Sequence, residues 1–148
     1  MIKSILFVCL GNICRSPLAE GIARHFEGEI TFDSAGLSGY HRGERPCKGS
    51  QAVAQRHHIS LEGITSRPIV YPQDDSFDLI VCMDSQNYED LLELGFDKDK
   101  IKKLGDFGFG GEDVPDPYYY VGDEGFERVY AMISEGVKNL LESIKEER

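Results

Sequence analysis

Unbroken apolar stretches alternate along the chain with stretches whose apolar residues recur every three or four positions. Residues 2–8 form a nearly continuous apolar run, which is typical of a strand covered on both faces in a parallel sheet. Residues 29–36, 76–84 and 101–104 have a similar strand-like character. The pattern therefore predicts four strands, each separated from the next by a helical or loop segment.

Helical spacing fills the intervals between these strands. Ser16 and Pro17 are typical of an N-cap and a first helical residue. Residues 47–58 predict a second helix, and Ser85 is a suitable cap for a third helix that stops at Gly95. The C-terminal segment has the clearest helical periodicity, with apolar side chains three and four residues apart.

Strands that alternate with helices are typical of an α/β fold with a parallel sheet and right-handed crossovers. The 148 residues suffice for one domain with a real core. We therefore expect a single domain, residues 1–148, in which helices flank the sheet as a three-layer sandwich. Ligands bind beyond the carboxyl ends of the strands in such sheets. The first strand and the loop after the fourth both reach this edge, so we expect functional residues there.

Composition narrows the class of partner. The net charge is -10, which argues against binding to nucleic acid or to an anionic membrane. No run approaches the roughly 20 apolar residues of a membrane span, and the N-terminus lacks a small-residue cleavage site, so we expect a cytoplasmic protein. The four cysteines are then expected to be reduced thiols. They lack zinc-binding spacing, and we expect neither a metal nor another cofactor.

One turn, VCLGNICRSPLAE at residues 8–20, holds more chemistry than a strand-to-helix turn needs. Its amides and the N-terminus of the following helix form an anion site. Gly11 relieves the backbone, Asn12 tolerates a left-handed conformation, and Arg15 offers a planar fork matched to two phosphate oxygens. We expect a phosphate-binding loop after the first strand that comprises Leu10, Gly11, Asn12, Ile13 and Cys14.

Cys9 lies at the floor of this turn. The amides, the helix dipole and the guanidinium that hold a phosphate also favour a thiolate over a thiol. A thiolate below a phosphate is placed for in-line attack on phosphorus. Ser16 can donate its hydroxyl to the sulfur and ease its departure in a second step. The turn thus combines a nucleophile, backbone amides that bind an anion and an arginine that pairs with the charge of a phosphate.

A second motif, VPDPYYY, lies in a long loop rich in glycine and proline at residues 105–123. Asp116 stands between two prolines, which restrict the backbone on both sides. Such rigid placement suits a proton donor. When a phosphate is removed from a tyrosine side chain, the departing phenol has a pKa of ~10 and needs a proton donor at neutral pH. Asp84, at the end of a predicted strand, either supports the catalytic turn or caps the next helix.

With these two motifs, and with DSAG and FDLIVCMDSQN between them, the chain resembles the low-molecular-weight protein tyrosine phosphatases over essentially its whole length. The resemblance implies a flavodoxin-like, four-stranded parallel sheet. It implies hydrolysis of phosphotyrosine in proteins, and of small aryl phosphates, through a phosphocysteine. Cys9 would be the nucleophile, and Arg15 would bind the phosphate. Ser16 would be the partner of the thiolate, and Asp116 would be the general acid and then the base.

Further residues are implied by the same resemblance. Asn12 would hold the loop in shape through a hydrogen bond to Ser34. Tyr118 and Tyr119 would form one wall of a deep cleft, with Tyr40 opposite. The expected partners are a tyrosine-phosphorylated protein or peptide and inorganic phosphate as product, and we expect a monomer or a weak dimer.

Two cysteines extend the comparison with the family. The resemblance implies a reversible disulfide between Cys14 and Cys9, which would protect the nucleophile from over-oxidation. The chain departs from the family pattern in the segment RPCKGS, where Cys47 and Gly49 stand at the places of an acidic residue and an arginine. This change concerns the substrate surface and leaves the catalytic residues intact.

Three other functions are alternatives to tyrosine phosphatase activity. Arginine phosphatases of the same superfamily tend to carry threonine at the position of Ile13, and an isoleucine favours an aromatic substrate. A thioredoxin-coupled arsenate reductase would need a cysteine relay, to which Cys82 in an apolar strand and an isolated Cys47 are poorly suited. A non-catalytic phosphoprotein-binding module would be expected to have lost Cys9 or Asp116.

Overall fold

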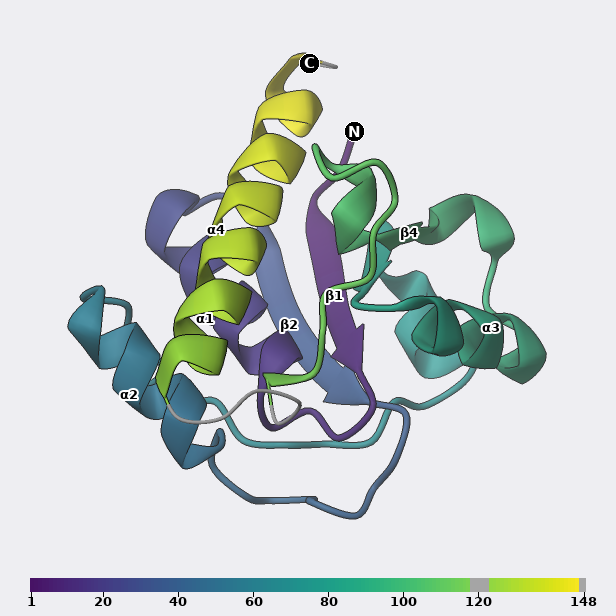
Figure 1. The fold of residues 1–148 in the computed structure, drawn as a ribbon. Coiled ribbons are helices and arrows are strands. Elements are labelled where there is room, and N and C mark those ends of the chain that lie inside the picture. The colour runs from purple at the N-terminus through teal and green to yellow at the C-terminus, as the bar shows by residue number, and fades with distance from the viewer. Residues whose placement is uncertain (118–122, 147–148) are drawn as a thin grey trace.

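The computed structural model describes residues 1–117 and 123–146, and its sheet has four parallel strands (Figure 1). These strands are β1 (Ser4–Cys9), β2 (Thr31–Gly36), β3 (Leu79–Cys82) and β4 (Ile101–Lys103). Their order is β2-β1-β3-β4, and every pairing is parallel. This is the flavodoxin-like order, so the predicted α/β fold with a four-stranded parallel sheet is confirmed.

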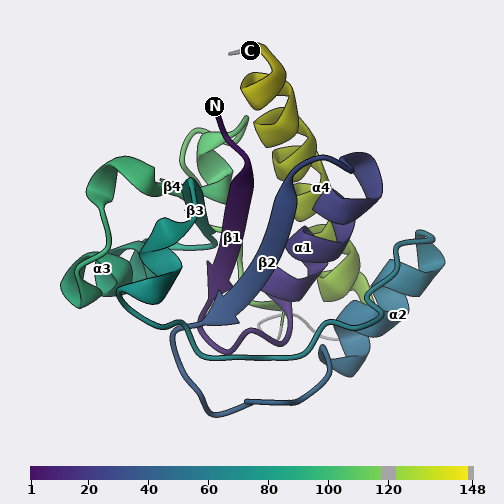
Figure 2. The ribbon, with the colours of Figure 1, turned by 180° about the vertical axis from the view of Figure 1, so that it is seen from behind.

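Helices cover both faces of the sheet and complete the three layers (Figures 1 and 2). One face carries α1 (Arg15–Phe26) and α4 (Asp123–Glu146), with α2 (Lys48–Arg56) beside them, and the other carries α3 (Ser85–Leu94). The short 3-10 helices are η1 (Gln73–Ser76), η2 (Lys98–Lys100) and η3 (Leu104–Asp106). Over residues 1–117 and 123–146, no helix combines the length and the apolar character needed to cross a membrane.

The two faces of the sheet bury different side chains, because successive residues of a strand point in opposite directions. Ile5 and Phe7 of β1 pack with the side chains of α1, α2 and α4, whereas Leu6 and Val8 pack on the face that α3 covers. All four are fully buried, which explains the unbroken apolar run at the start of the chain. Cys9 belongs to the first of these clusters and therefore lies on the α1 face.

The start of α1 differs from the prediction. The helix begins at Arg15, so Ser16 is its second residue and not its N-cap. The Ser16 hydroxyl lies 3.1 Å from the sulfur of Cys9, and this contact takes the place of the predicted capping bond. A serine before a proline is a good capping signal, but here the hydroxyl serves the turn that precedes the helix.

The start of α3 also differs from the prediction, whereas its end agrees. Asp84, and not Ser85, is the N-cap, because its carboxylate accepts a hydrogen bond from the amide of Asn87 at 2.8 Å. Gly95 follows the last helical residue with φ of 106°, a left-handed conformation that favours glycine. The segment therefore forms the predicted helix with a different capping residue.

The topology brings the ends of β1 and β3 to one edge of the sheet. In the flavodoxin-like order, ligands bind at this edge, where the chain leaves β1 to one side and β3 to the other. The end of β2 packs directly on the turn after β1, since a Cβ atom at Gly36 would lie 3.0 Å from the carbonyl oxygen of Leu10. The fold thus places the turn of residues 9–15 at the centre of the ligand-binding edge.

Candidate active site

The turn after β1, here called the phosphate-binding loop (residues 9–15), has its carbonyl groups directed outward. Five of them accept hydrogen bonds from the surrounding chain: Cys9 O from Leu37 N at 3.1 Å, Leu10 O from Ser38 N at 2.9 Å, Gly11 O from Ser66 Oγ at 3.0 Å, Ile13 O from Cys47 N at 2.6 Å and Cys14 O from Ser50 Oγ at 2.9 Å. Because a trans peptide places its N–H opposite its C=O, the amides that follow point inward. The loop is therefore a concave ring of donors, as an anion site requires.

Two donors point at the sulfur of Cys9. The amide of Asn12 donates to Sγ at 3.3 Å, and the hydroxyl of Ser16 lies 3.1 Å away. Asn12 Nδ2 donates to Ser16 Oγ at 2.8 Å, so the hydroxyl proton of Ser16 is directed to the sulfur. Hydrogen bonds of this kind stabilise a thiolate, which is the nucleophilic form of cysteine.

Asn12 holds the loop through its conformation and its side chain. Its φ is 54°, the left-handed conformation predicted for this position. Its Oδ1 accepts a hydrogen bond from the amide of Arg67 at 3.0 Å, which ties the loop to the segment beyond β2. The Asn12 side chain therefore connects the start of α1, through Ser16, with the segment beyond β2, through Arg67.

Ser34 has a different partner from the expected one. Its hydroxyl donates to Glu20 Oε1 of α1 at 2.6 Å, whereas the described hydrogen bonds of the Asn12 side chain go to Ser16 and Arg67. The carboxylate of Glu20 is buried, and burial raises its pKa while the Ser34 hydrogen bond and nearby Arg24 lower it. A buried carboxylate requires a donor, and Ser34 supplies it, so Ser34 supports the loop through α1.

Arg15 is fixed by two acceptors at one end of its guanidinium. Nη1 donates to Asp84 Oδ2 at 2.9 Å and to the carbonyl oxygen of Val114 at 2.8 Å. Among the described residues both bonds use Nη1, which leaves the edge formed by Nε and Nη2 for a bidentate contact with phosphate. Asp84 thus does both things that its sequence position suggested, since one oxygen supports the loop and the other caps α3.

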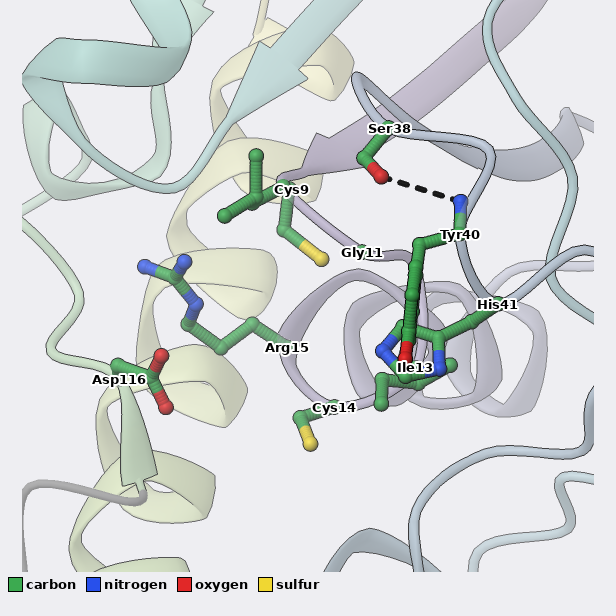
Figure 3. A pocket seen from close by; sticks show the side chains of 10 residues that line it. Cys9, Gly11, Ile13, Cys14, Arg15, Ser38, Tyr40, His41 and Asp116 are labelled. Carbon is green, nitrogen blue, oxygen red and sulfur yellow. Dashed lines mark hydrogen bonds between the residues drawn. The ribbon is translucent and has the colours of Figure 1, made fainter.

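A cavity of about 410 Å³ opens above the sulfur. Asp116 lies on one side of it, and Tyr40 and His41 lie on the opposite side (Figure 3). Tyr40 is 85% exposed, so it forms the rim of the cavity. Tyr118 and Tyr119, expected to form the facing wall, lie outside the described residues. The structure therefore brings Cys9, Arg15, Asp116 and Tyr40 to one cavity, as the sequence predicted.

The sequence and the fold have counterparts in known proteins. Residues 4–148 match the model of a family described as low molecular weight phosphotyrosine protein phosphatase. The chain belongs to this family. A curated phosphatase relative, the low molecular weight protein-tyrosine-phosphatase YfkJ of Bacillus subtilis, is 43% identical over 155 residues, which cover 98% of this chain and 97% of the relative.

Solved structures of the same fold agree with this family. The crystal structure of YfkJ from Bacillus subtilis gives a TM-score of 0.91 at 40% identity and covers 100% of this chain and 98% of its own. A crystal structure of a Drosophila arginine phosphatase gives 0.86 at 32% identity and covers 95% and 97%. The predicted fold and the predicted tyrosine phosphatase family are confirmed, and the chain is a phosphatase.

The cysteine pairing in this phosphatase differs from the expected one. Cys14 forms a disulfide with Cys47, with their Cα atoms 5.4 Å apart, and Cys9 is free. The expectations of a Cys9–Cys14 disulfide and of an isolated, reduced Cys47 are therefore wrong for this structure. Cys14 precedes α1 and Cys47 precedes α2, and the amide of Cys47 donates to Ile13 O, so the two helix starts lie at disulfide distance.

Cys82 lies apart from the phosphatase site. It belongs to the cluster on the α3 face of the sheet, whereas Cys9 belongs to the opposite cluster. Burial and, to a smaller extent, the nearby carboxylate of Asp84 together raise the pKa of the Cys82 thiol to about 12. A buried thiol on the far face of the sheet cannot exchange with Cys9, which argues against a cysteine relay of the arsenate reductase kind.

Sequence reasoning missed several residues of this phosphatase site. His41 lines the cavity and packs closely on Gly11, where a Cβ atom would lie 3.1 Å from His41 Cδ2. The only signal for His41 was its place beside Tyr40. Asp113 and Lys103 form an ion pair near the site. Neither residue belongs to a sequence motif that indicates a function.

Proposed function

We propose that this phosphatase hydrolyses phosphotyrosine in proteins, and small aryl phosphates, through a phosphocysteine formed at Cys9. The observation that supports this most strongly is the sulfur itself, which lies inside the ring of amides with the Asn12 amide and the Ser16 hydroxyl directed at it. A phosphate held by the ring meets that sulfur along the axis of the loop. The chain's own residues supply each charge and proton that the reaction needs.

In the first step, the thiolate of Cys9 attacks phosphorus, and the bond between phosphorus and the phenolic oxygen breaks. Asp116, on the wall of the cavity, gives its proton to that oxygen, so the phenol leaves neutral. Arg15 and the loop amides stabilise the negative charge on the three oxygens of the transferred group. The products are a phosphocysteine and an unmodified tyrosine side chain.

In the second step, a water molecule attacks phosphorus, and Asp116 as a carboxylate takes its proton. The bond between sulfur and phosphorus breaks, and inorganic phosphate leaves. The returning thiolate is stabilised by the Ser16 hydroxyl and the Asn12 amide, which lie within hydrogen-bond distance of it. The enzyme ends in the state in which it began.

The shape of the cavity supports tyrosine over arginine as the substrate residue. Ile13 lines the cavity, and its side chain has no polar atom with which to bind a guanidinium or a water molecule. Tyr40 at the rim adds an aromatic surface of the kind that packs against a phenyl ring. A fold of this kind also occurs in an arginine phosphatase, so the fold alone does not separate the two substrates.

We further propose that the chain functions as one domain, residues 1–148, as a cytoplasmic monomer or weak dimer. The family match over residues 4–148 supports the single domain. The proposed partner is a tyrosine-phosphorylated protein or peptide, and the net charge of -10 argues against nucleic acid and anionic membranes as partners.

A direct test compares two versions of one peptide, one with phosphotyrosine and the other with phosphoarginine. We expect kcat/KM for phosphotyrosine to be higher by about 10²-fold, because the apolar wall favours the phenyl ring. Ile13→Thr should narrow this ratio, and Cys9→Ser should abolish both activities. A higher kcat/KM for phosphoarginine would overturn the proposed substrate while leaving the phosphocysteine mechanism in place.

A further inference from the structure

The segment that carries Asp116, here called the acid segment (residues 113–116), is attached to the junction between β3 and α3. The amide of Val114 donates to the carbonyl oxygen of Met83 at 2.8 Å. The carbonyl oxygen of Val114 accepts from Arg15 Nη1 at 2.8 Å. These two bonds attach Val114 at its amide and its carbonyl group, and the residue before it is held by a side chain.

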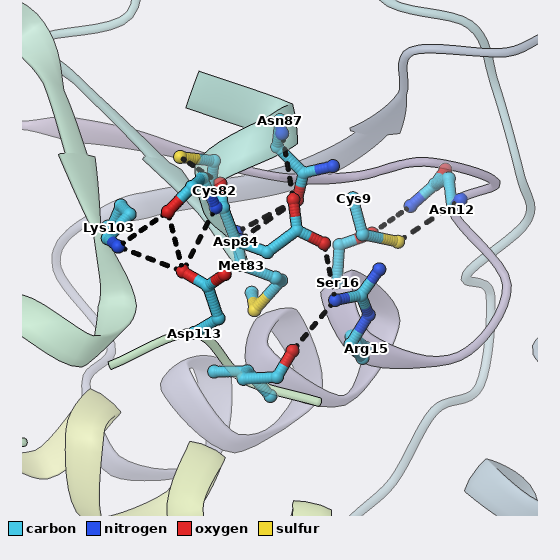
Figure 4. A network of polar contacts seen from close by, with 12 residues as sticks. Cys9, Asn12, Arg15, Ser16, Cys82, Met83, Asp84, Asn87, Lys103 and Asp113 are labelled. Atoms are coloured by element: carbon cyan, nitrogen blue, oxygen red, sulfur yellow. Dashed lines mark hydrogen bonds and ion pairs between the residues drawn. The ribbon is translucent and has the colours of Figure 1, made fainter. Parts of the chain in front are cut away.

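The side chain of Asp113 makes that attachment. Its Oδ1 accepts from Lys103 Nζ at 2.8 Å, from the Ser85 amide at 3.0 Å and from Ser85 Oγ at 2.9 Å. Lys103 Nζ also donates to Ser85 Oγ at 3.0 Å, so the three residues close on one another. Figure 4 shows the contact between Lys103 and Asp113. The Lys103–Asp113–Ser85 cluster therefore ties the acid segment to β4 and to the start of α3.

The cluster is ionised at neutral pH. The hydrogen bond from Lys103 lowers the pKa of Asp113, and the same bond raises the pKa of Lys103. The side chain of Asp113 is 46% exposed and that of Lys103 is 18% exposed. Exposed ion pairs contribute little to the stability of a fold, so stability alone gives no strong reason for this cluster.

The backbone beyond Asp113 can transmit its position to Asp116. Pro115 has a fixed φ, and the residue before each proline is confined to extended conformations. Val114 precedes Pro115 and Asp116 precedes Pro117, so few torsions are free between the cluster and the acid. A shift at position 113 therefore moves the Asp116 carboxyl relative to the cavity.

Resting on the proposed function, we propose that Lys103 and Asp113 are positioning residues that set the distance between the general acid Asp116 and the leaving oxygen. The cluster acts from outside the cavity, because neither side chain lines the space above Cys9. Its loss leaves phosphate binding intact and impairs proton donation. The effect should therefore grow with the basicity of the leaving group.

The test measures kcat/KM for a series of aryl phosphates whose phenols differ in pKa. For Asp113→Asn and Lys103→Met, we expect a loss of about tenfold with an unactivated phenol, because small displacements of a catalytic group are costly. With a strongly activated phenol, which leaves without a proton, the loss should be under about twofold. Lys103→Arg, which keeps the donor, should restore most of the loss.

Two controls make the result decisive. Glu127→Gln removes a similar exposed pair, Arg56–Glu127, at a distance from the cavity, and should leave the whole series unchanged. In an Asp116→Asn background, Asp113→Asn should cause no further loss, because the acid that it positions is gone. An equal loss for all phenols, or an additive loss in the double variant, would overturn the positioning role.

The Asp116→Asn variant by itself separates this inference from the proposed function. If that variant shows no dependence on the leaving group, the assignment of Asp116 as the acid fails. If it shows a steep dependence while Asp113→Asn and Lys103→Met show none, only the positioning role fails.

Discussion

The phosphate-binding loop and the acid segment face one cavity, but the protein holds them in different ways. The loop is bonded at five of its carbonyl groups to residues from three other parts of the chain, and a disulfide at Cys14 adds a covalent tie. The described bonds of the acid segment include two backbone bonds of Val114 and the side-chain bonds of Asp113.

This difference matches the demands of the two chemical roles. The sulfur must lie in line with phosphorus in both steps, and a site with many supports tolerates the loss of one of them. The acid must reach an oxygen that differs from one substrate to the next, so a change in a support of its segment alters the distance to that oxygen. Supports of the loop should therefore affect mainly stability, and supports of the acid segment should affect mainly the rate.

The largest effect on stability is expected from Cys47→Ser, which removes the covalent tie of the loop. Without reductant, the free energy of unfolding should fall by about 2–4 kcal/mol, because the disulfide restricts the unfolded chain. Catalysis should change little, since Cys9 and its donors are untouched. Chemical denaturation with and without reductant measures the effect, and the unaltered protein should match the variant once reductant is present. Equal stability without reductant, or a peptide map that joins Cys9 to Cys14, would contradict this pairing.

A smaller effect, on the rate, is expected from Asp84→Asn, which changes a partner of the phosphate-binding side chain of Arg15 and not a support of the loop backbone. An asparagine oxygen can still cap α3, so stability should be nearly unchanged. The amide nitrogen cannot accept from Arg15, and the loss of a charged hydrogen bond of about 1.5–3 kcal/mol should lower kcat/KM by about 10- to 100-fold.

The control for this change is Glu89→Gln, an exposed carboxylate on the same helix. Steady-state kinetics and chemical denaturation of the two variants should separate the roles of Asp84. A loss of stability without a loss of rate in Asp84→Asn would mean that capping is the only role of this residue.

Local patterns in the sequence predict the fold and the loop well. The apolar run of β1, the glycine and asparagine of the turn and the helical spacing after it are contiguous, so their physical causes can be read within about twenty residues. Asn12 adopts the left-handed conformation expected of it, and Asp84 lies at the strand end where support or capping was predicted.

Contacts between distant segments are where the sequence fails as a guide. The predicted contact between the Ser16 hydroxyl and the Cys9 sulfur is present, although Ser16 is not the N-cap of α1. Ser34 is expected to bond with Asn12, but its hydroxyl donates to the buried Glu20. Cys14 and Cys47 are 33 residues apart, and neither spacing nor composition predicts that pair. The same holds for Asp113, whose partners come from β4 and from the start of α3. Such contacts depend on packing and have no local signature.

The central claim is that the sulfur of Cys9 takes the phosphate. The test mixes the enzyme rapidly with an aryl phosphate that is labelled on its phosphate group and denatures the protein within milliseconds. The peptide that carries the label is then identified. We expect release of about one equivalent of phenol ahead of phosphate, with the phosphate attached to Cys9, and neither event in Cys9→Ser. Simultaneous release of phenol and phosphate with no phosphate on the protein at any time, or a phosphorylated residue other than Cys9, would contradict the account.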